Sequence, residues 1–166
     1  MKLIVLTIAL YMLLVNLTFA QDVAIFYDAS VEVLGVNDAV GFANLLVKEL
    51  ENKKITAEIV DSDGLAEYMN NNQKGIYLVT QGCTPGTIFK NQGKKDLVYT
   101  WLREGGIGGF VGDYAFYYYW DKGARITAAG AGQQSVFGAT VTNGTVTQVV
   151  PTELCKKYIP SLKKWT

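Results

Sequence analysis

Residues 75–89 read GIYLVTQGCTPGTIF, residues 94–106 read KKDLVYTWLREGG, and residues 107–120 read IGGFVGDYAFYYYW. The order is an apolar strand, a polar glycine-proline loop, a helix and a second apolar strand. This order is typical of one crossover unit of a parallel sheet. Because ligands of such sheets bind beyond the carboxyl ends of the strands, the loops 81–86 and 112–114 are the first candidates for a site.

The chain upstream continues the same alternation of strands and helices. Short apolar runs predict four strands, over residues 23–27, 56–60, 76–80 and 107–111. Stretches with helical spacing lie between them, and their predicted caps are Asn37 or Asp38, Ser62 or Asp63, and Asp96. The pattern predicts a three-layer α/β fold of the flavodoxin-like type, with strand order 2-1-3-4 and helices on both faces.

The pattern weakens after Trp120. Residues 135–150 alternate Thr and Val around Asn143-Gly144, which predicts a C-terminal β-hairpin. Thr152 is the predicted cap of a short terminal helix. The sequence contains no repeat and no low-complexity linker, so we expect residues 21–166 to form a single domain. Whether this domain is C-terminally incomplete stays open.

Residues 1–20 differ from the rest of the chain. Lys2 precedes an apolar run, and small residues stand at Thr18 and Ala20, a pattern typical of a secretory signal peptide cleaved before Gln21. The segment also approaches the lower length limit of a spanning helix, so an uncleaved membrane anchor is the alternative. Both interpretations predict a secreted or extracytoplasmic domain, with membrane contact only through this segment.

The composition narrows the classes of partner and chemistry. Basic and acidic residues balance at 15 each, which gives no electrostatic basis for nucleic-acid binding. Outside the cytoplasm Cys83 and Cys155 can form a disulfide, and a buried thiol at Cys83 is the alternative. Asn143 fits a glycosylation sequon, although Asn-Gly is also a turn signal.

The chain has no histidine. This excludes Cys-His and Ser-His activation of a nucleophile and most zinc sites. We predict no metal and no cofactor. A helix cap explains the acidic residues at 61–63, and the glycine run 105–112 follows a helix, whereas the dinucleotide fingerprint follows a strand. Cys83 stays a candidate nucleophile, but it would need a different base or a helix N-terminus.

Residues 114–120 contain the densest aromatic cluster of the sequence. Exposed Tyr and Trp rings offer flat apolar area with a polar tip, which suits stacking on sugars. The alternative is that some of the rings close the core and the others lie on the surface. Asp113, directly before the cluster, could bond a ligand hydroxyl or cap the turn.

Several short motifs resemble the class I glutamine amidotransferase-like superfamily, and more narrowly its secreted members near the ThuA-like branch. The matching residues lie between positions 23 and 118 and are Thr80-Gln81-Gly82, Pro85, Thr87-Ile88, Trp101-Leu102, Gly105-Gly106, Gly112-Asp113 and Phe116-Tyr117-Tyr118. In catalytic members the nucleophilic cysteine stands where this chain has Asp113, and the histidine partner is absent here. The resemblance therefore implies the fold and its crevice without the hydrolytic chemistry. The link of ThuA-like relatives with carbohydrate use favours a sugar-type ligand.

We therefore expect an exported, non-catalytic domain that binds a small polar ligand or glycan where strands one and three diverge. The predicted ligand-binding residues are Tyr27, Asp28, Ser30, Gln81, Gly82, Thr84, Asp113, Tyr114 and Tyr117. Two alternatives stay open. One is a hydrolase or transferase that uses Asp28, Asp113 or Cys83, since two carboxylates about 5–5.5 or 6.5–9.5 Å apart can cleave glycosides. The other is a structural module of a larger exported protein.

Overall fold

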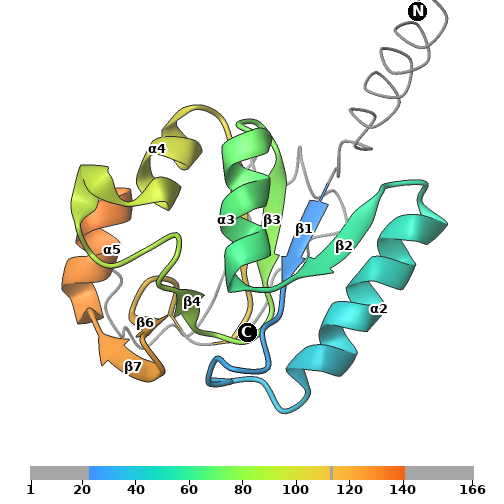
Figure 1. The fold of residues 1–166 in the computed structure, drawn as a ribbon, viewed down its shortest axis with the longest axis horizontal. Helices are drawn as coiled ribbons and strands as arrows, with labels where there is room; N and C mark the ends of the chain where they lie inside the picture. The colour runs from blue at the N-terminus through green and yellow to red at the C-terminus, as the bar shows by residue number, and fades with distance from the viewer. Residues whose placement is uncertain (1–22, 113, 141–166) are drawn as a thin grey trace, which may run out of the picture.

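The structure is a computed structural model that describes residues 23–112 and 114–140 (Figure 1). Its main sheet consists of four parallel strands, β1 (Val23–Phe26), β2 (Ala57–Val60), β3 (Ile76–Val79) and β5 (Ile107–Phe110). The strand order is β2-β1-β3-β5. This confirms the predicted order, because a two-residue strand precedes β5 and shifts only its number. The α/β fold of the flavodoxin-like type is therefore confirmed.

Helices cover both faces of the main sheet, as predicted. They are α2 (Ala39–Asn52), α3 (Ser62–Asn71), α4 (Leu97–Arg103) and α5 (Ala129–Phe137), with a short 3-10 helix η1 (Gly93–Lys95) before α4. Figure 1 shows α2 on one side of the strands and the other three α-helices on the opposite side. None of the helices within the described ranges combines the length and apolar character needed to cross a membrane.

The alternation of side chains along β1 divides the core into two layers. Val23 and Ile25 point toward α2 and pack with Ala43. Ala24 and Phe26 point the other way, into the larger cluster that α3, α4 and α5 cover. All four side chains of β1 are buried, which is the burial expected for a central parallel strand with a continuous apolar sequence.

Side-chain caps set the starts of α2 and α3. Asp38 caps α2 by accepting the Gly41 N–H at 2.8 Å, which confirms one of the two predicted caps. The cap of α3 is Asp61, which accepts the Gly64 N–H at 2.8 Å, so the predicted caps Ser62 and Asp63 were wrong. The helix begins one residue after the strand end, and this places Ser62 in its first turn with its N–H and hydroxyl free to bond another segment.

A second, three-stranded sheet lies beside the carboxyl ends of the parallel strands (Figure 1). It consists of β4 (Thr84–Pro85), β6 (Tyr118–Asp121) and β7 (Ala124–Thr127), in the order β4-β6-β7. β6 and β7 form an antiparallel hairpin whose two-residue turn is Lys122-Gly123. Both turn residues have positive φ, 52° and 75°, as a type I′ turn requires.

An antiparallel hairpin thus follows the four strands of the parallel sheet, but earlier in the chain than we predicted. Ser135, the predicted start of the Thr/Val hairpin, belongs to α5, which ends at Gly138 with a left-handed φ of 72°. The remainder of that prediction, together with Asn143 and the terminal helix, lies outside the described residues. The same holds for residues 1–20, Asp113 and Cys155.

Candidate ligand-binding cleft

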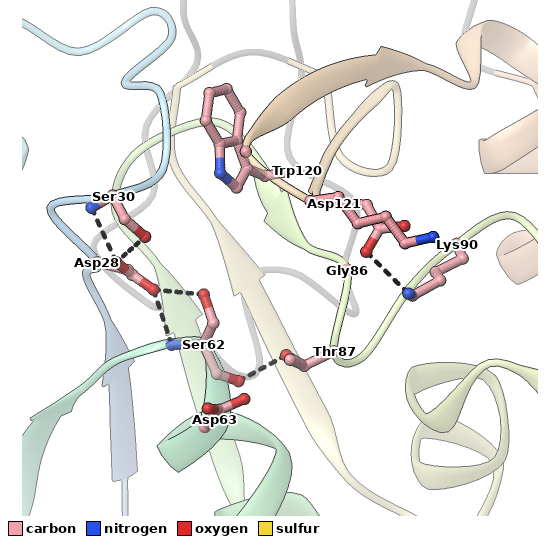
Figure 2. A pocket seen from close by; sticks show the side chains of 11 residues that line it. Asp28, Ser30, Ser62, Asp63, Gly86, Thr87, Lys90, Trp120 and Asp121 are labelled. Carbon is pink, nitrogen blue, oxygen red and sulfur yellow. Dashed lines mark hydrogen bonds and ion pairs between the residues drawn. The ribbon is translucent and has the colours of Figure 1, made fainter.

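An open cleft of about 570 Å³ lies between the carboxyl ends of β1 and β2 and the β6–β7 hairpin (Figure 2). One wall belongs to the parallel sheet, with Asp28 and Ser30 after β1 and Ser62 and Asp63 at the start of α3. The opposite wall consists of loop and hairpin residues, namely Gly86, Thr87, Lys90, Trp120, Asp121, Lys122 and Gly123. The cleft lies at the carboxyl-end edge of the sheet, where ligands of open α/β sheets bind, but beside β1 and β2 and not at the switch point between β1 and β3.

The Asp28 carboxylate organises the first wall. One of its oxygens accepts the N–H and the hydroxyl of Ser30, at 2.9 and 2.6 Å. The other accepts the N–H of Ser62 at 3.2 Å and also the Ser62 hydroxyl. Partial burial raises the pKa of Asp28, but these hydrogen bonds together lower it more, so the pKa lies below its ordinary value. Asp28 is therefore ionised at neutral pH and does not serve as a general acid there.

The serine and threonine hydroxyls of the cleft can act toward a ligand only as hydrogen-bond acceptors. The hydroxyl protons of Ser30 and Ser62 are both donated to Asp28. Thr87 donates its hydroxyl proton to the carbonyl oxygen of Ser62 at 2.5 Å. Because a hydroxyl has one proton and two lone pairs, all three can offer a ligand only lone pairs. With the exposed carboxylate of Asp63, Ser30 and Ser62 make the first wall a wall of hydrogen-bond acceptors, and Thr87 adds an acceptor from the loop on the opposite side.

The opposite wall presents an aromatic ring. The half-buried Trp120 projects its indole from β6 toward the side of the cleft that carries Asp28 and Ser30 (Figure 2). Gly86 holds its own loop close to this strand, since its N–H donates to the Trp120 carbonyl oxygen at 2.7 Å. A Cβ at position 86 would lie 2.6 Å from that oxygen, so only glycine permits the approach.

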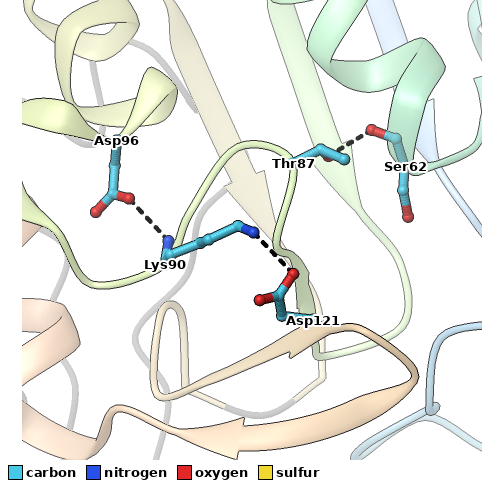
Figure 3. A network of polar contacts seen from close by, with 5 residues as sticks. All are labelled: Ser62, Thr87, Lys90, Asp96 and Asp121. Atoms are coloured by element: carbon cyan, nitrogen blue, oxygen red, sulfur yellow. Dashed lines mark hydrogen bonds and ion pairs between the residues drawn. The ribbon is translucent and has the colours of Figure 1, made fainter.

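Lys90 and Asp96 fix the loop between these two walls (Figure 3). The Lys90 ammonium pairs with the Asp121 carboxylate at 2.8 Å, which ties the loop to the hairpin. The buried Asp96 carboxylate accepts the N–H groups of Lys90 and Gln92, at 2.8 and 2.7 Å. Asp96 precedes α4 as predicted, but its side chain makes no capping bond to that helix. It holds the loop that lines the cleft.

The crevice that we predicted between strands one and three is filled by the protein itself. Gln81 is fully buried, and its amide nitrogen donates to the carbonyl oxygens of Asp28 and Val31, at 3.1 and 2.9 Å. Its amide oxygen accepts the Asp28 N–H at 2.7 Å. The Leu34 N–H donates to the Gln81 carbonyl oxygen at 2.8 Å. Gln81 therefore holds the loop after β1 over the end of β3, and the prediction that it binds a ligand is not supported by its position.

The three residues after Gln81 are also buried. Gly82 packs against Gly112, where a Cβ would lie 2.8 Å from the Gly82 Cα. The Thr84 hydroxyl is buried and has no hydrogen-bond partner among the described residues. Neither Gly82 nor Thr84 lines the cleft, so the loop predicted to bind the ligand has become part of the interior.

Cys83 is a buried, free thiol in the described part of the chain. Burial raises its pKa, the nearby Glu32 raises it further, and Arg125 lowers it, with a resulting pKa of about 12. The thiol is therefore protonated at neutral pH, whereas nucleophilic cysteines have a depressed pKa. Cys83 does not have the environment of a catalytic nucleophile. Its pairing with Cys155 lies outside the described residues.

The predicted tyrosines do not line the cleft. Tyr27 packs against the cluster under α2. Tyr114 and Tyr117 contact each other, with ring centroids 6.0 Å apart. The adjacent Phe116 is buried and packs on Phe89 at 5.0 Å. The alternative for the aromatic cluster is thus confirmed for Phe116, which closes the core, while Trp120 is the ring that enters the cleft.

The cleft therefore contains two of the predicted residues, Asp28 and Ser30. Sequence reasoning did not include Ser62, Thr87 or Trp120 among the ligand-binding residues, although it singled out the aromatic cluster to which Trp120 belongs for stacking on sugars. Ser62 could have been predicted from the sequence, because it follows the carboxyl end of β2 as Asp28 follows that of β1. No signal in the sequence places Trp120 opposite them, since this depends on the pairing of β4 with β6.

Within the described ranges, no group of three or more Cys, Asp or Glu side chains is arranged to hold a metal ion. Comparisons with protein-family models, with curated proteins and with solved structures found no match to this chain. The residues of the cleft are therefore the basis for an inference about function.

Proposed function

We propose that the protein is an exported, non-catalytic binding domain that takes a polyhydroxylated ligand, a sugar ring of a glycan, in the cleft between Asp28 and Trp120. The observation that carries this proposal is the wall of hydrogen-bond acceptors opposite an aromatic ring. Membership of the amidotransferase-like superfamily near its ThuA-like branch, with its link to carbohydrates, is part of the same proposal.

The acceptor wall suits the hydroxyl groups of a sugar. Each sugar hydroxyl has a proton to donate, and Ser30, Ser62 and Thr87 have committed their own protons elsewhere. The apolar face of the same ring can pack on the Trp120 indole, which combines flat apolar area with a polar N–H. The cleft volume of about 570 Å³ lies within the usual range for small-molecule sites.

Three properties of the titratable groups favour binding over hydrolysis. The sequence contains no histidine to act as a base. The pKa of Cys83 is raised to about 12, so its thiolate is not available at neutral pH. The pKa of Asp28 is lowered, so it cannot donate the proton that a glycoside leaving group needs.

The test is a glycan array followed by calorimetric titration of the best ligand against the mature protein. Trp120→Ala should weaken binding about tenfold, the effect expected from loss of a stacked ring. Asp63→Asn should also weaken it. The matched controls are Tyr114→Ala, an exposed ring outside the cleft, and Glu67→Gln, an exposed carboxylate on α3 outside the cleft.

Three outcomes would contradict the proposal. Absence of any glycan ligand, or equal losses in Trp120→Ala and Tyr114→Ala, would favour a structural module. Release of a cleaved or transferred sugar from the bound glycan would establish an enzyme that uses carboxylates, and Asp113 would then be the first residue to substitute.

A further inference from the structure

The cleft does not end at the loop between its walls. A second cavity of about 170 Å³ lies beyond this loop, and the two cavities share Gly86, Thr87 and Lys90 as lining residues. The second cavity is also lined by Gln92, which directly precedes η1, and by Lys95, the last residue of η1. The two cavities therefore adjoin at this loop, with Trp120 lining the first and Lys95 lining the second, and together they are called the groove below.

The two ends of this groove differ in charge. At the first end Asp63 is an exposed carboxylate next to the acceptor hydroxyls. At the second end Lys95 is an exposed cation that forms no ion pair with any described residue. Asp96 does not neutralise it toward a ligand, because the Asp96 carboxylate is buried and accepts the N–H groups of Lys90 and Gln92.

Lys90 lies at the junction of the two cavities, and its ammonium is paired with Asp121 at 2.8 Å, as Figure 3 shows. The first cavity also has an exposed cation, Lys122 on the hairpin wall, which forms no ion pair with any described residue. The first cavity therefore presents both signs of charge, Asp63 on one wall and Lys122 on the other, whereas the exposed charge of the second cavity is the cation Lys95. A ligand with hydroxyl donors in the first cavity and an anionic group in the second matches this arrangement.

We propose that the groove takes an acidic oligosaccharide, with a neutral ring between Asp63 and Trp120 and the carboxylate of an adjoining uronic acid unit at Lys95. This inference rests on the proposed function, because the ring at Trp120 provides the anchor. An anionic unit next to Asp63 would be repelled, whereas one next to Lys95 is attracted.

The test compares three probes by calorimetry with the mature protein at low ionic strength. The probes are a neutral glucan tetrasaccharide, an acidic tetrasaccharide in which galacturonic acid alternates with a neutral sugar, and galacturonic acid itself. The acidic tetrasaccharide should bind about two- to fivefold more tightly than the neutral one, the range expected for an exposed ion pair. The preference should decrease as salt is added.

Lys95→Gln should remove this preference and leave binding of the neutral tetrasaccharide unchanged. Lys94→Gln is the matched control, because Lys94 is exposed in the same 3-10 helix and lines neither cavity. Galacturonic acid alone should bind more weakly than the acidic tetrasaccharide, since it cannot contact Trp120 and Lys95 together.

Equal binding of the two tetrasaccharides, or equal effects of Lys95→Gln and Lys94→Gln, would overturn the acidic preference. If Trp120→Ala still weakened binding of the neutral probe in that case, the proposed function would stand without this extension. If galacturonic acid bound as tightly as the acidic tetrasaccharide, the anion would bind by itself, and the spanning ligand would be rejected. Unchanged affinity of every probe in Trp120→Ala would reject both proposals.

Discussion

At the scale of single residues, Asp28 connects the stability of the fold with the geometry of the cleft. Its carboxylate accepts four hydrogen bonds, two from Ser30 in its own loop and two from Ser62, which lies 34 residues further along the chain. Asp28→Asn leaves only one side-chain oxygen as an acceptor, so we expect a loss of about 1–2 kcal/mol at pH 7, discounted for the partial exposure of the site. Urea denaturation of the two proteins measures this loss.

The loss of stability in Asp28→Asn should become smaller as the pH falls. The pKa of Asp28 is lowered in the folded state. Its contribution to stability is therefore complete above the pKa of the unfolded chain, about 4, and is lost as pH falls through the lower folded pKa. The difference between wild type and Asp28→Asn should shrink between pH 5 and pH 3. A difference that stays constant over this range would show that Asp28 is not stabilised as an anion.

Cys83 gives a second prediction at this scale. Because burial raises the pKa of its thiol to about 12, Cys83 should react slowly with a thiol reagent at pH 8 in the folded protein and rapidly in urea. The measurement needs the Cys155→Ser background, so that one thiol is followed. Fast labelling of the folded protein would contradict the burial of Cys83 and restore it as a candidate nucleophile.

At the scale of elements, the β6–β7 hairpin carries the aromatic wall of the cleft, and its turn is not optimal. Lys122 adopts a φ of 52°, a region that costs a non-glycine residue roughly 1 kcal/mol. Asn tolerates this region and is preferred at this position of a type I′ turn. Lys122→Asn should therefore raise the free energy of unfolding by about 0.5–1 kcal/mol, as measured by urea denaturation. A decrease would show that the Lys122 side chain stabilises the hairpin.

The contact between β4 and β6 gives a prediction about Gly86. An alanine there would place its Cβ 2.6 Å from the Trp120 carbonyl oxygen. We expect Gly86→Ala to cost about 2–3 kcal/mol, as overpacking against backbone does. Gly93→Ala is the comparator, since a Cβ at this site meets nothing within 4 Å and incurs only the strain of its positive φ, about 1 kcal/mol. Equal losses in thermal or urea unfolding would contradict the close approach.

The parallel strands could be predicted from sequence because each is a short apolar run buried by helices. The residues of β1 and β3 alternate between the two core layers. Both strands can therefore be recognised from their local sequence, without knowledge of distant parts of the chain. The hairpin could not be predicted in the same way. Its turn is Lys-Gly, which is a weaker signal for a hairpin than Asn-Gly. The aromatic residues of β6 also do not identify a strand by themselves, because aromatic residues are common in the core whatever the secondary structure. The helix α5 was missed because its sequence is rich in Ala and Gly.

The site was predictable only where it follows from strand ends. Asp28 and Ser30 follow β1 directly, and the structure places both in the cleft. Gln81 follows β3 by the same rule, yet it is buried because its side chain bonds the loop after β1. The rule identifies which residues gather at this edge of the sheet. Which of them face solvent depends on how the loops pack, and this information is spread over distant positions.

At the scale of the whole molecule, the structure confirms the fold that we predicted from the sequence, whereas export stays a prediction. We expect the full chain, expressed with a C-terminal tag in a secreting host, to appear in the medium with Gln21 as its first residue. Intact mass and N-terminal sequencing measure this directly. A tagged protein that keeps residues 1–20 and sediments with membranes would favour the anchor, and one that stays in the cytoplasm would contradict both interpretations.

The presence of two sheets has a consequence for how this protein can change over evolutionary time. One wall of the cleft belongs to the parallel sheet, whose core strands tolerate little substitution. The other belongs to the hairpin, whose strand β6 packs its rings against the core, whereas the residues of β7 and of the Lys122-Gly123 turn are exposed. Replacements in β7 and insertions at the turn can therefore accumulate with little effect on folding. Divergent copies of this protein should keep the serine-aspartate wall and β6 and vary the turn and β7, so that new recognition arises at one exposed edge of the cleft.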